Sequence, residues 1–188
     1  MDSIQLMVDE HVYIKRMLSV LRKYSYRLLK GAEVDFEDFY KMIDFVRNYA
    51  DKHHHGKEED LLFNRMVENQ GPAAEKLVKN GMLVEHDLGR LHMQELEEAI
   101  ERVKAGDDES KLDVIANAIS YTHLLHRHID KEDVVVYKFA QNGLSKEIID
   151  EINAQCETFE NEASAQGVQE KYIKLLEELE QKQTSYGR

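Results

Sequence analysis

The sequence contains few of the residues that interrupt helices and almost none that cross-link a chain. Its 188 residues include one proline and nine glycines, which leaves little room for the many turns of a loop-rich all-β fold. The one cysteine, Cys156, has no partner for an internal disulfide and lies far from the histidines in the sequence. We therefore expect Cys156 to be an ordinary buried or half-buried helix residue and not part of a thiolate metal site.

Long apolar runs and an excess of positive charge are also missing. No apolar stretch approaches the ~20 residues that cross a bilayer, and residues 1–5 lack the basic and apolar segments of a secretory signal. The net charge of −12 leaves no basic cluster to neutralise phosphates, which argues against nucleic-acid binding. We expect an acidic, soluble, cytoplasmic protein without a membrane or nucleic-acid partner.

What the sequence does contain is helical periodicity. Glu, Lys, Leu and Ala favour helices, and apolar residues recur at alternating steps of three and four, which predicts amphipathic helices. The first predicted helix covers residues 4–28 and ends at Gly31. The second begins near Asp35, and its apolar face continues into His54 and Glu58.

The second half of the chain repeats this layout. A short helical piece reaches Lys79, and Asn80-Gly81 is expected to interrupt it before a third long helix over residues 82–103. A fourth long helix is predicted from about Glu109 to Gln141. Two C-terminal helices without histidine are predicted from the apolar stripes at 148–159 and 168–179.

Each of the four long apolar faces contains one histidine, and two of these histidines are followed four residues later by glutamate. Residues four apart in a helix point to the same side, so each His-x-x-x-Glu pair can offer a nitrogen and an oxygen to one point. The six candidate metal ligands are His11, His54, Glu58, His86, His128 and Glu132.

The first His-x-x-x-Glu copy contains three consecutive histidines, and the apolar face selects the middle one, His54. Steps of four from His53 reach Lys57, a poor residue for the interior. Steps of four from His55 reach Glu59, one position round the helix, and this pair stays open as the alternative. Five histidines lie off the apolar faces, and we expect them to face solvent or to surround the ligands. They are His53, His55, His92, His123 and His126.

The spacing of the histidines indicates a duplicated helical hairpin. His11 precedes His54 by 43 residues, and the next two histidines in the set are 42 residues apart. Four such helices packed antiparallel bring four imidazoles and two carboxylates to one level of the core. Buried carboxylates cost several kcal/mol each, roughly, unless they are neutralised. Imidazole with carboxylate suits iron, manganese or zinc, and six groups exceed the needs of one tetrahedral zinc, so the pattern predicts two metal ions.

The order His, His-x-x-x-Glu, His, His-x-x-x-Glu resembles the hemerythrin-like, or HHE cation-binding, proteins over about residues 5–140. The segments that carry the resemblance are HHGKEEDLLF at 54–63, EHDLGR at 85–90 and HIDKED at 128–133. It implies an all-α fold, an up-down antiparallel four-helix bundle with extra C-terminal helices. We expect residues 1–142 to form this bundle. Residues 143–188 are expected to form a helical extension that packs on the bundle or serves in association, for example as a homodimer.

The resemblance also implies a non-haem di-iron cofactor. By position, the four histidines of the candidate set correspond to terminal ligands and the two glutamates to carboxylates that bridge the irons. Oxygen-carrying hemerythrins have His-x-x-x-His on the third helix, but Met82 and Arg90 occupy the positions four residues from His86. A fifth imidazole is therefore missing unless His92 or another residue supplies it.

A second departure concerns the last helix of the bundle. The carriers use His-x-x-x-x-Asp there, a spacing that His128 and Asp133 satisfy. Asp133 lies about 140° round the helix from His128 on a 3.6-residue period, whereas Glu132 stays on the apolar face. The duplication also selects Glu132, and Asp133 stays open as the alternative.

The resemblance implies a protein that binds or senses O₂, peroxide or NO at the metal pair. The alternatives are an enzyme that turns over peroxide or NO, and a protein for iron handling or iron-sulfur repair. Repair proteins of this kind often carry an extra N-terminal segment with a cysteine. This sequence starts directly with the first predicted helix, so iron-sulfur repair is the less favoured hypothesis. A structural bundle with a vestigial site is a further reading. The Glu-x-x-His signature of ferritin-like bundles and the His-Glu-x-x-His signature of zinc proteases are absent.

Overall fold

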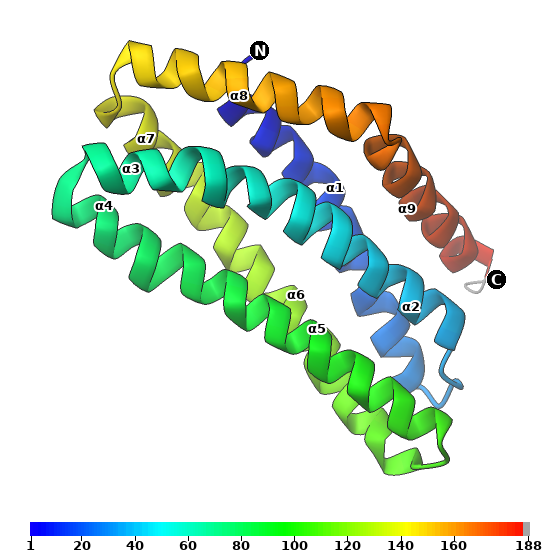
Figure 1. The fold of residues 1–188 in the computed structure, drawn as a ribbon. Helices are drawn as coiled ribbons and strands as arrows, with labels where there is room; N and C mark the ends of the chain where they lie inside the picture. The colour runs from blue at the N-terminus through cyan, green and yellow to red at the C-terminus, as the bar shows by residue number, and fades with distance from the viewer. Residues whose placement is uncertain (186–188) are drawn as a thin grey trace.

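The chain folds into long helices joined by short turns, as Figure 1 shows for this computed structural model, which describes residues 1–185. Four helical segments run up and down as an antiparallel bundle, and two C-terminal helices follow. The first half of the bundle consists of α1 (Ser3–Leu29), α2 (Phe36–Phe45), η1 (Val46–His55), η2 (Glu58–Phe63) and α3 (Asn64–Asn69). The second half consists of α4 (Gly71–Leu77), η3 (Val78–Met82), α5 (Leu83–Lys104), η4 (Asp108–Ser110), α6 (Lys111–Lys131), η5 (Glu132–Val136) and α7 (Tyr137–Gly143). The C-terminal helices are α8 (Lys146–Ala165) and α9 (Val168–Ser185). The predicted all-α bundle with extra C-terminal helices is confirmed.

The helix ends follow from local sequence chemistry. Asp2 accepts a hydrogen bond from the backbone N–H of Gln5 at the start of α1, and Ser145 accepts one from Ile148 at the start of α8. Gly31 has φ of +88°, the left-handed conformation that glycine adopts without strain, and the predicted end of the first helix is confirmed.

The predicted interruption at Asn80-Gly81 is wrong. Residues 78–82 form η3, a π-helical turn that continues from α4 into α5. A π-turn forms i→i+5 hydrogen bonds and so accommodates an extra residue without ending the helix. Three of the predicted ligands lie in the other π-helical segments: His54 in η1, Glu58 in η2 and Glu132 in η5.

The predicted ligands lie in a layer between two apolar clusters. One cluster fills the end of the bundle around the α5–α6 turn, where Ile14, Leu21 and Phe39 are buried. The other fills the opposite end, around α3, α4 and α7. In α1, Met7 belongs to the second cluster and Ile14 to the first, with His11 between them. The polar layer is therefore enclosed along the bundle axis by apolar side chains on both sides.

The C-terminal helices lie against α1 and the second bundle helix (Figure 1). The backbone N–H of Ser3 donates to Asn153 Oδ1 of α8 at 2.9 Å. Arg16 of α1 donates two hydrogen bonds to Glu180 of α9, at 3.0 and 2.7 Å. Cys156 is buried in α8, as expected for a helix residue. The division at residue 142, the homodimer and the cytoplasmic location stay predictions.

None of the helices within residues 1–185 combines the length and the apolar character that a membrane crossing requires.

Candidate metal centre

All six predicted ligands come together in the middle of the bundle. Each is at most 1% exposed. The Nε2 atoms of His11 and His54 are 3.0 Å apart, and so are those of His86 and His128. Each of the four histidines therefore lies on the side of its helix that faces the interior of the bundle.

The donor atoms form two overlapping groups, each compact enough to surround one cation. Within a group, all candidate donor atoms lie within 4.8 Å of one another. The first group is His11, His54, Glu58 and Glu132, and the second is His55, Glu58, His86 and His128. Glu58 belongs to both. Glu132 also spans them, since its Oε1 lies 2.9 Å from His128 Nε2 and its Oε2 lies 3.3 Å from His11 Nε2.

His55 is a correction to the sequence-based expectation, because it joins the cluster instead of facing solvent or surrounding it. Its ring is buried and stacks on His86 with centroids 3.8 Å apart. The π-helical hydrogen bonding of η1 places an extra residue in the turn, so two consecutive histidines reach the core. The alternative partner Glu59 lies outside the cluster, 2.6 Å from His86 Nδ1.

The fifth imidazole of the cluster therefore comes from the second bundle helix and not from the third. His92, which was considered for this position, is half-buried elsewhere and contacts Asn117 Oδ1 at 3.4 Å. His123 and His126 are exposed, as expected. His53 is buried but lies outside the cluster, where its Nε2 is 3.1 Å from Glu10 Oε1.

Glu132 and Asp133 have different places. Glu132 is fully buried among the imidazoles. Asp133 lies on the outer side of His11, with Oδ1 2.7 Å from Nδ1. The geometry therefore supports Glu132 as the inner carboxylate. Asp133 instead orients the imidazole of His11.

Each imidazole of the cluster has a carboxylate at its outer nitrogen Nδ1. Such a partner fixes the tautomer and ring orientation, leaves Nε2 free for a metal and raises its basicity. The five pairs are His11–Asp133 (2.7 Å), His54–Glu10 (2.8 Å), His55–Asp51 (3.3 Å), His86–Glu59 (2.6 Å) and His128–Glu85 (2.9 Å).

The sequence did not predict that Glu10, Asp51 and Glu85 are hydrogen-bond partners of the imidazoles. A signal for two of them was present, because Glu10 directly precedes His11 and Glu85 directly precedes His86. Each of these glutamates contacts the histidine of the following helix, so the duplication extends to the residues behind the ligands. Asp51 is a local partner, one helical turn before His55.

Burial and charge give the groups different protonation tendencies in the absence of a cation. Burial lowers the pKa of His54 to about 4, which keeps its imidazole neutral and able to bind a metal. Burial and the nearby Glu132 raise the pKa of Glu58 well above its ordinary value. Burial alone would lower the pKa of His128, but Glu132 and Glu85 outweigh it and raise the pKa to about 9.

The inner carboxylates also have unsatisfied oxygens. Among the described residues, Glu58 Oε2 and both oxygens of Glu132 are buried and receive no hydrogen bond of suitable angle, although His128 Nε2 and His11 Nε2 lie 2.9 and 3.3 Å from the Glu132 carboxylate. The remaining oxygen of Glu58 accepts a hydrogen bond from the hydroxyl of Tyr137 at 2.6 Å. Buried polar atoms normally have a partner, and an unpaired carboxylate is costly. Cations bound between the imidazoles would satisfy these oxygens, so the residues present fit a metal pair.

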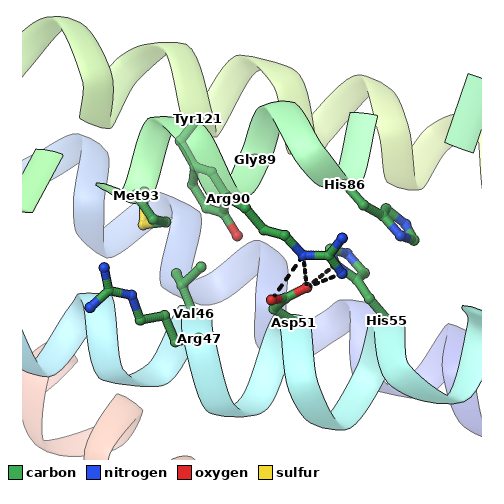
Figure 2. A pocket seen from close by; sticks show the side chains of 9 residues that line it. All are labelled: Val46, Arg47, Asp51, His55, His86, Gly89, Arg90, Met93 and Tyr121. Carbon is green, nitrogen blue, oxygen red and sulfur yellow. Dashed lines mark hydrogen bonds and ion pairs between the residues drawn. The ribbon is translucent and has the colours of Figure 1, made fainter. Parts of the chain in front are cut away.

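A cavity of about 120 Å³ adjoins the second group between η1 and α5. Figure 2 shows His55 and His86 at one end of it and the hydroxyl of Tyr121 pointing into it. Gly89 contributes no side chain, and Arg90 donates to Asp51 Oδ1 at 2.9 Å beside His55. A small molecule therefore has room next to the centre.

The comparisons with known proteins agree with this geometry. A family model described as "Hemerythrin HHE cation binding domain" matches residues 2–140. This range contains both donor groups and ends within α7, before α8 begins. Searches of curated proteins and of solved structures found no match.

Proposed function

The chain belongs to the hemerythrin HHE cation binding domain family, and on that premise we propose that it is a non-haem di-iron protein that binds or senses O₂, peroxide or NO. The group with His11 and His54 would hold one iron, and the group with His55, His86 and His128 would hold the other. Glu58 and Glu132, whose carboxylates adjoin both groups, would serve as ligands shared by the pair.

The observation that carries the proposal is the set of unpartnered carboxylate oxygens on Glu58 and Glu132 among five imidazole nitrogens. Nitrogen and carboxylate donors together suit iron, and the cluster contains no thiolate. Five nitrogens and four oxygens do not fill two six-coordinate ions, which leaves positions for an added ligand. When bound, ferrous ions can supply electrons to O₂, peroxide or NO.

The cavity beside His55 and His86 supports a small ligand. Its volume of about 120 Å³ suits a molecule of a few atoms, and it reaches the imidazoles of the second group. We propose it as the route by which such a ligand approaches the irons.

Peroxide turnover is the second candidate, and Tyr137 is the observation that favours it. Its hydroxyl donates to Glu58 Oε1 and lies 3.5 Å from His11 Nε2, inside the centre. Burial raises the pKa of Tyr137 well above its ordinary value, so the hydroxyl stays protonated and can donate a hydrogen bond to a bound peroxide. Oxygen evolution from hydrogen peroxide that is lost in Tyr137→Phe would support this candidate.

Iron analysis after anaerobic reconstitution tests the main proposal. We expect two irons per chain in the wild type and in His126→Ala, which removes an exposed histidine that makes no hydrogen bond or ion pair within the described residues. His54→Ala should lose iron. Fewer than one iron per chain in the wild type would contradict the proposal. A visible absorption band that forms with O₂ and reverses under vacuum would support binding over turnover.

A further inference from the structure

A buried lysine joins the C-terminal helix α8 to one imidazole of the centre. Lys57 is 0% exposed, and its ammonium group contacts the carboxylates of Glu10 and Glu160. Glu10 accepts a hydrogen bond from His54 Nδ1 at 2.8 Å. We propose that Glu160 is a positioning residue of the metal centre, which acts on His54 through Lys57 and Glu10. The inference rests on the proposed role of His54 as a ligand.

The cluster around Lys57 resembles a cation site that the lysine itself fills. Donor atoms of Glu10, His53 and Glu160 lie within 4.8 Å of one another. The Nε2 atom of His53 is 3.1 Å from Glu10 Oε1, 3.3 Å from Glu160 Oε1 and 3.3 Å from the ammonium nitrogen. The ring of Phe159 covers the cluster, with its centroid 5.7 Å from that nitrogen. A buried ammonium group is tolerated only with such close partners, and two carboxylates share this one.

The duplicated half of the chain provides an internal comparison. Lys131 contacts Glu85, and Glu85 accepts a hydrogen bond from His128 Nδ1 at 2.9 Å. The order lysine, glutamate, histidine is thus the same in both halves. The side chain of Lys131 is 48% exposed, however, and no second carboxylate contacts it among the described residues. Glu160 is therefore an addition to the repeated pattern, and α8 supplies it from beyond the matched range 2–140.

The physical effect follows from how the two carboxylates share one ammonium group. A carboxylate at Nδ1 fixes the imidazole and makes it a stronger metal ligand. An ammonium group draws charge away from that carboxylate. Because the ammonium group of Lys57 also interacts with Glu160, it neutralises the charge of the Glu10 carboxylate less. Glu10 is then a stronger hydrogen-bond acceptor for His54 Nδ1–H. Without Glu160, the ammonium should bind Glu10 alone, and His54 should become a weaker ligand with a less fixed ring.

Glu160→Gln and Glu157→Gln form a matched pair for the experiment. Both remove one negative charge from α8, but Glu157 is exposed and makes no hydrogen bond or ion pair within the described residues. Each full-length variant is loaded with Co²⁺. Competition titration gives the affinity of the two ions, and proton NMR gives the metal-shifted resonances of the imidazole Nδ1–H groups.

In Glu160→Gln, one of the two Co²⁺ ions should bind about tenfold more weakly, at the low end of the effect of residues behind metal ligands. One Nδ1–H resonance should move and exchange faster with water, and it should be the resonance that Glu10→Gln also moves. Glu157→Gln should match the wild type in both measurements. In a Glu10→Gln background, Glu160→Gln should have no further effect on affinity, because the two residues act in series.

Several results would overturn the inference. Glu160→Gln with wild-type affinities and resonances would do so directly. A shift of all Nδ1–H resonances together with a lower melting temperature would show a structural role only. An undiminished effect of Glu160→Gln in the Glu10→Gln background would exclude transmission through Glu10. A wild-type protein that binds no metal would instead overturn the proposed function, and this inference with it.

Discussion

The two halves of the centre contain the same groups in different surroundings. His54 with Glu10 and Lys57 corresponds to His128 with Glu85 and Lys131 through the duplication. The first set is enclosed by α8, whereas the second reaches the surface through its lysine. The duplication therefore repeats the order histidine, glutamate, lysine in both halves. Helix α8 shields only the copy with His54 from solvent.

The halves also differ in their free space. The position that corresponds to His55 in the other copy is Ile129, so the third imidazole of the second group has no counterpart. The 120 Å³ cavity lies on this same side, beside His55 and His86. We therefore propose that an added ligand enters on the side with the cavity and not on the side covered by α8.

The strongest effect should come from Glu132→Ala, because Glu132 serves both halves. We expect this variant to lose both metal ions, whereas His54→Ala and His128→Ala should each lose one. Asp130→Ala is the control, since the side chain of Asp130 is 73% exposed and contacts Lys15 and no residue of the cluster, and it should keep both ions. Metal-to-protein ratios after reconstitution and gel filtration measure the outcome. Two ions retained in Glu132→Ala would contradict a carboxylate shared by both halves.

The carboxylates behind the two equivalent histidines allow a direct comparison of dry and wet surroundings. Glu10→Gln should weaken metal binding by about 10–100-fold, the range for residues that orient metal ligands. Glu85→Gln should have a smaller effect, because the side chains of Glu85 and its partner Lys131 are 19% and 48% exposed, and water there can replace lost hydrogen bonds. Competition titration with a chelator measures both variants. Equal losses would show that coverage by α8 does not matter.

The second C-terminal helix, α9, is anchored to the bundle by Asp38. Asp38 is buried and accepts hydrogen bonds from Lys182 at 2.6 Å and Tyr24 at 2.5 Å. Asp38→Asn should lower the free energy of unfolding at pH 7 by about 1.5–3 kcal/mol, the usual worth of hydrogen bonds to a charged group. Asp44→Asn, at a more exposed contact to α9, should cost less. Urea unfolding measures both.

The pH dependence of this anchor has a defined sign. Burial raises the pKa of Asp38, but Lys182 and Tyr24 outweigh it and hold the pKa below its ordinary value of 3.8. Stabilisation by a carboxylate with a lowered pKa is present above the unfolded-state value and is lost as the pH falls through the folded-state value. The difference between wild type and Asp38→Asn should therefore shrink as the pH falls below about 3.8. A difference that grows in acid would contradict it.

Much of the architecture could be predicted because helical periodicity and burial are coupled. The apolar faces located the bundle helices, and a histidine such as His11 was conspicuous on a face that otherwise excludes polar groups. His55 could not be predicted in this way. A helical face is drawn with 3.6 residues per turn, and the second bundle helix departs from that period at η1.

Lys57 was misjudged for a different reason. A lysine is a poor interior residue unless it is paired, and its partners Glu10 and Glu160 lie 47 and 103 residues away in the sequence. No periodic pattern connects residues at such distances. The tertiary packing of α8 decides that this lysine is buried, and only a structure reveals it.

The smallest expected effect is that of Gly89→Ala, which changes only the half of the centre that adjoins the cavity. A Cβ atom added at Gly89 would lie 3.4 Å from Tyr121 Cε2 and 3.5 Å from Leu125 Cδ2, which is ordinary van der Waals contact. Alanine in place of a helical glycine should raise the free energy of unfolding by about 0.5–1 kcal/mol. The added methyl group also narrows the cavity, so azide should bind the iron-loaded protein more slowly while the iron content stays unchanged.

Gly81→Ala separates the two effects of that substitution. Gly81 is also helical, an added Cβ would have no atom within 4 Å, and Gly81 is not among the residues that line the cavity. It should gain similar stability without a change in the rate of azide binding, which stopped-flow absorbance measures. Equal azide rates in both variants would mean that ligands reach the centre by another path. Slower binding in Gly89→Ala alone would locate ligand access on the side of the centre that α8 leaves uncovered.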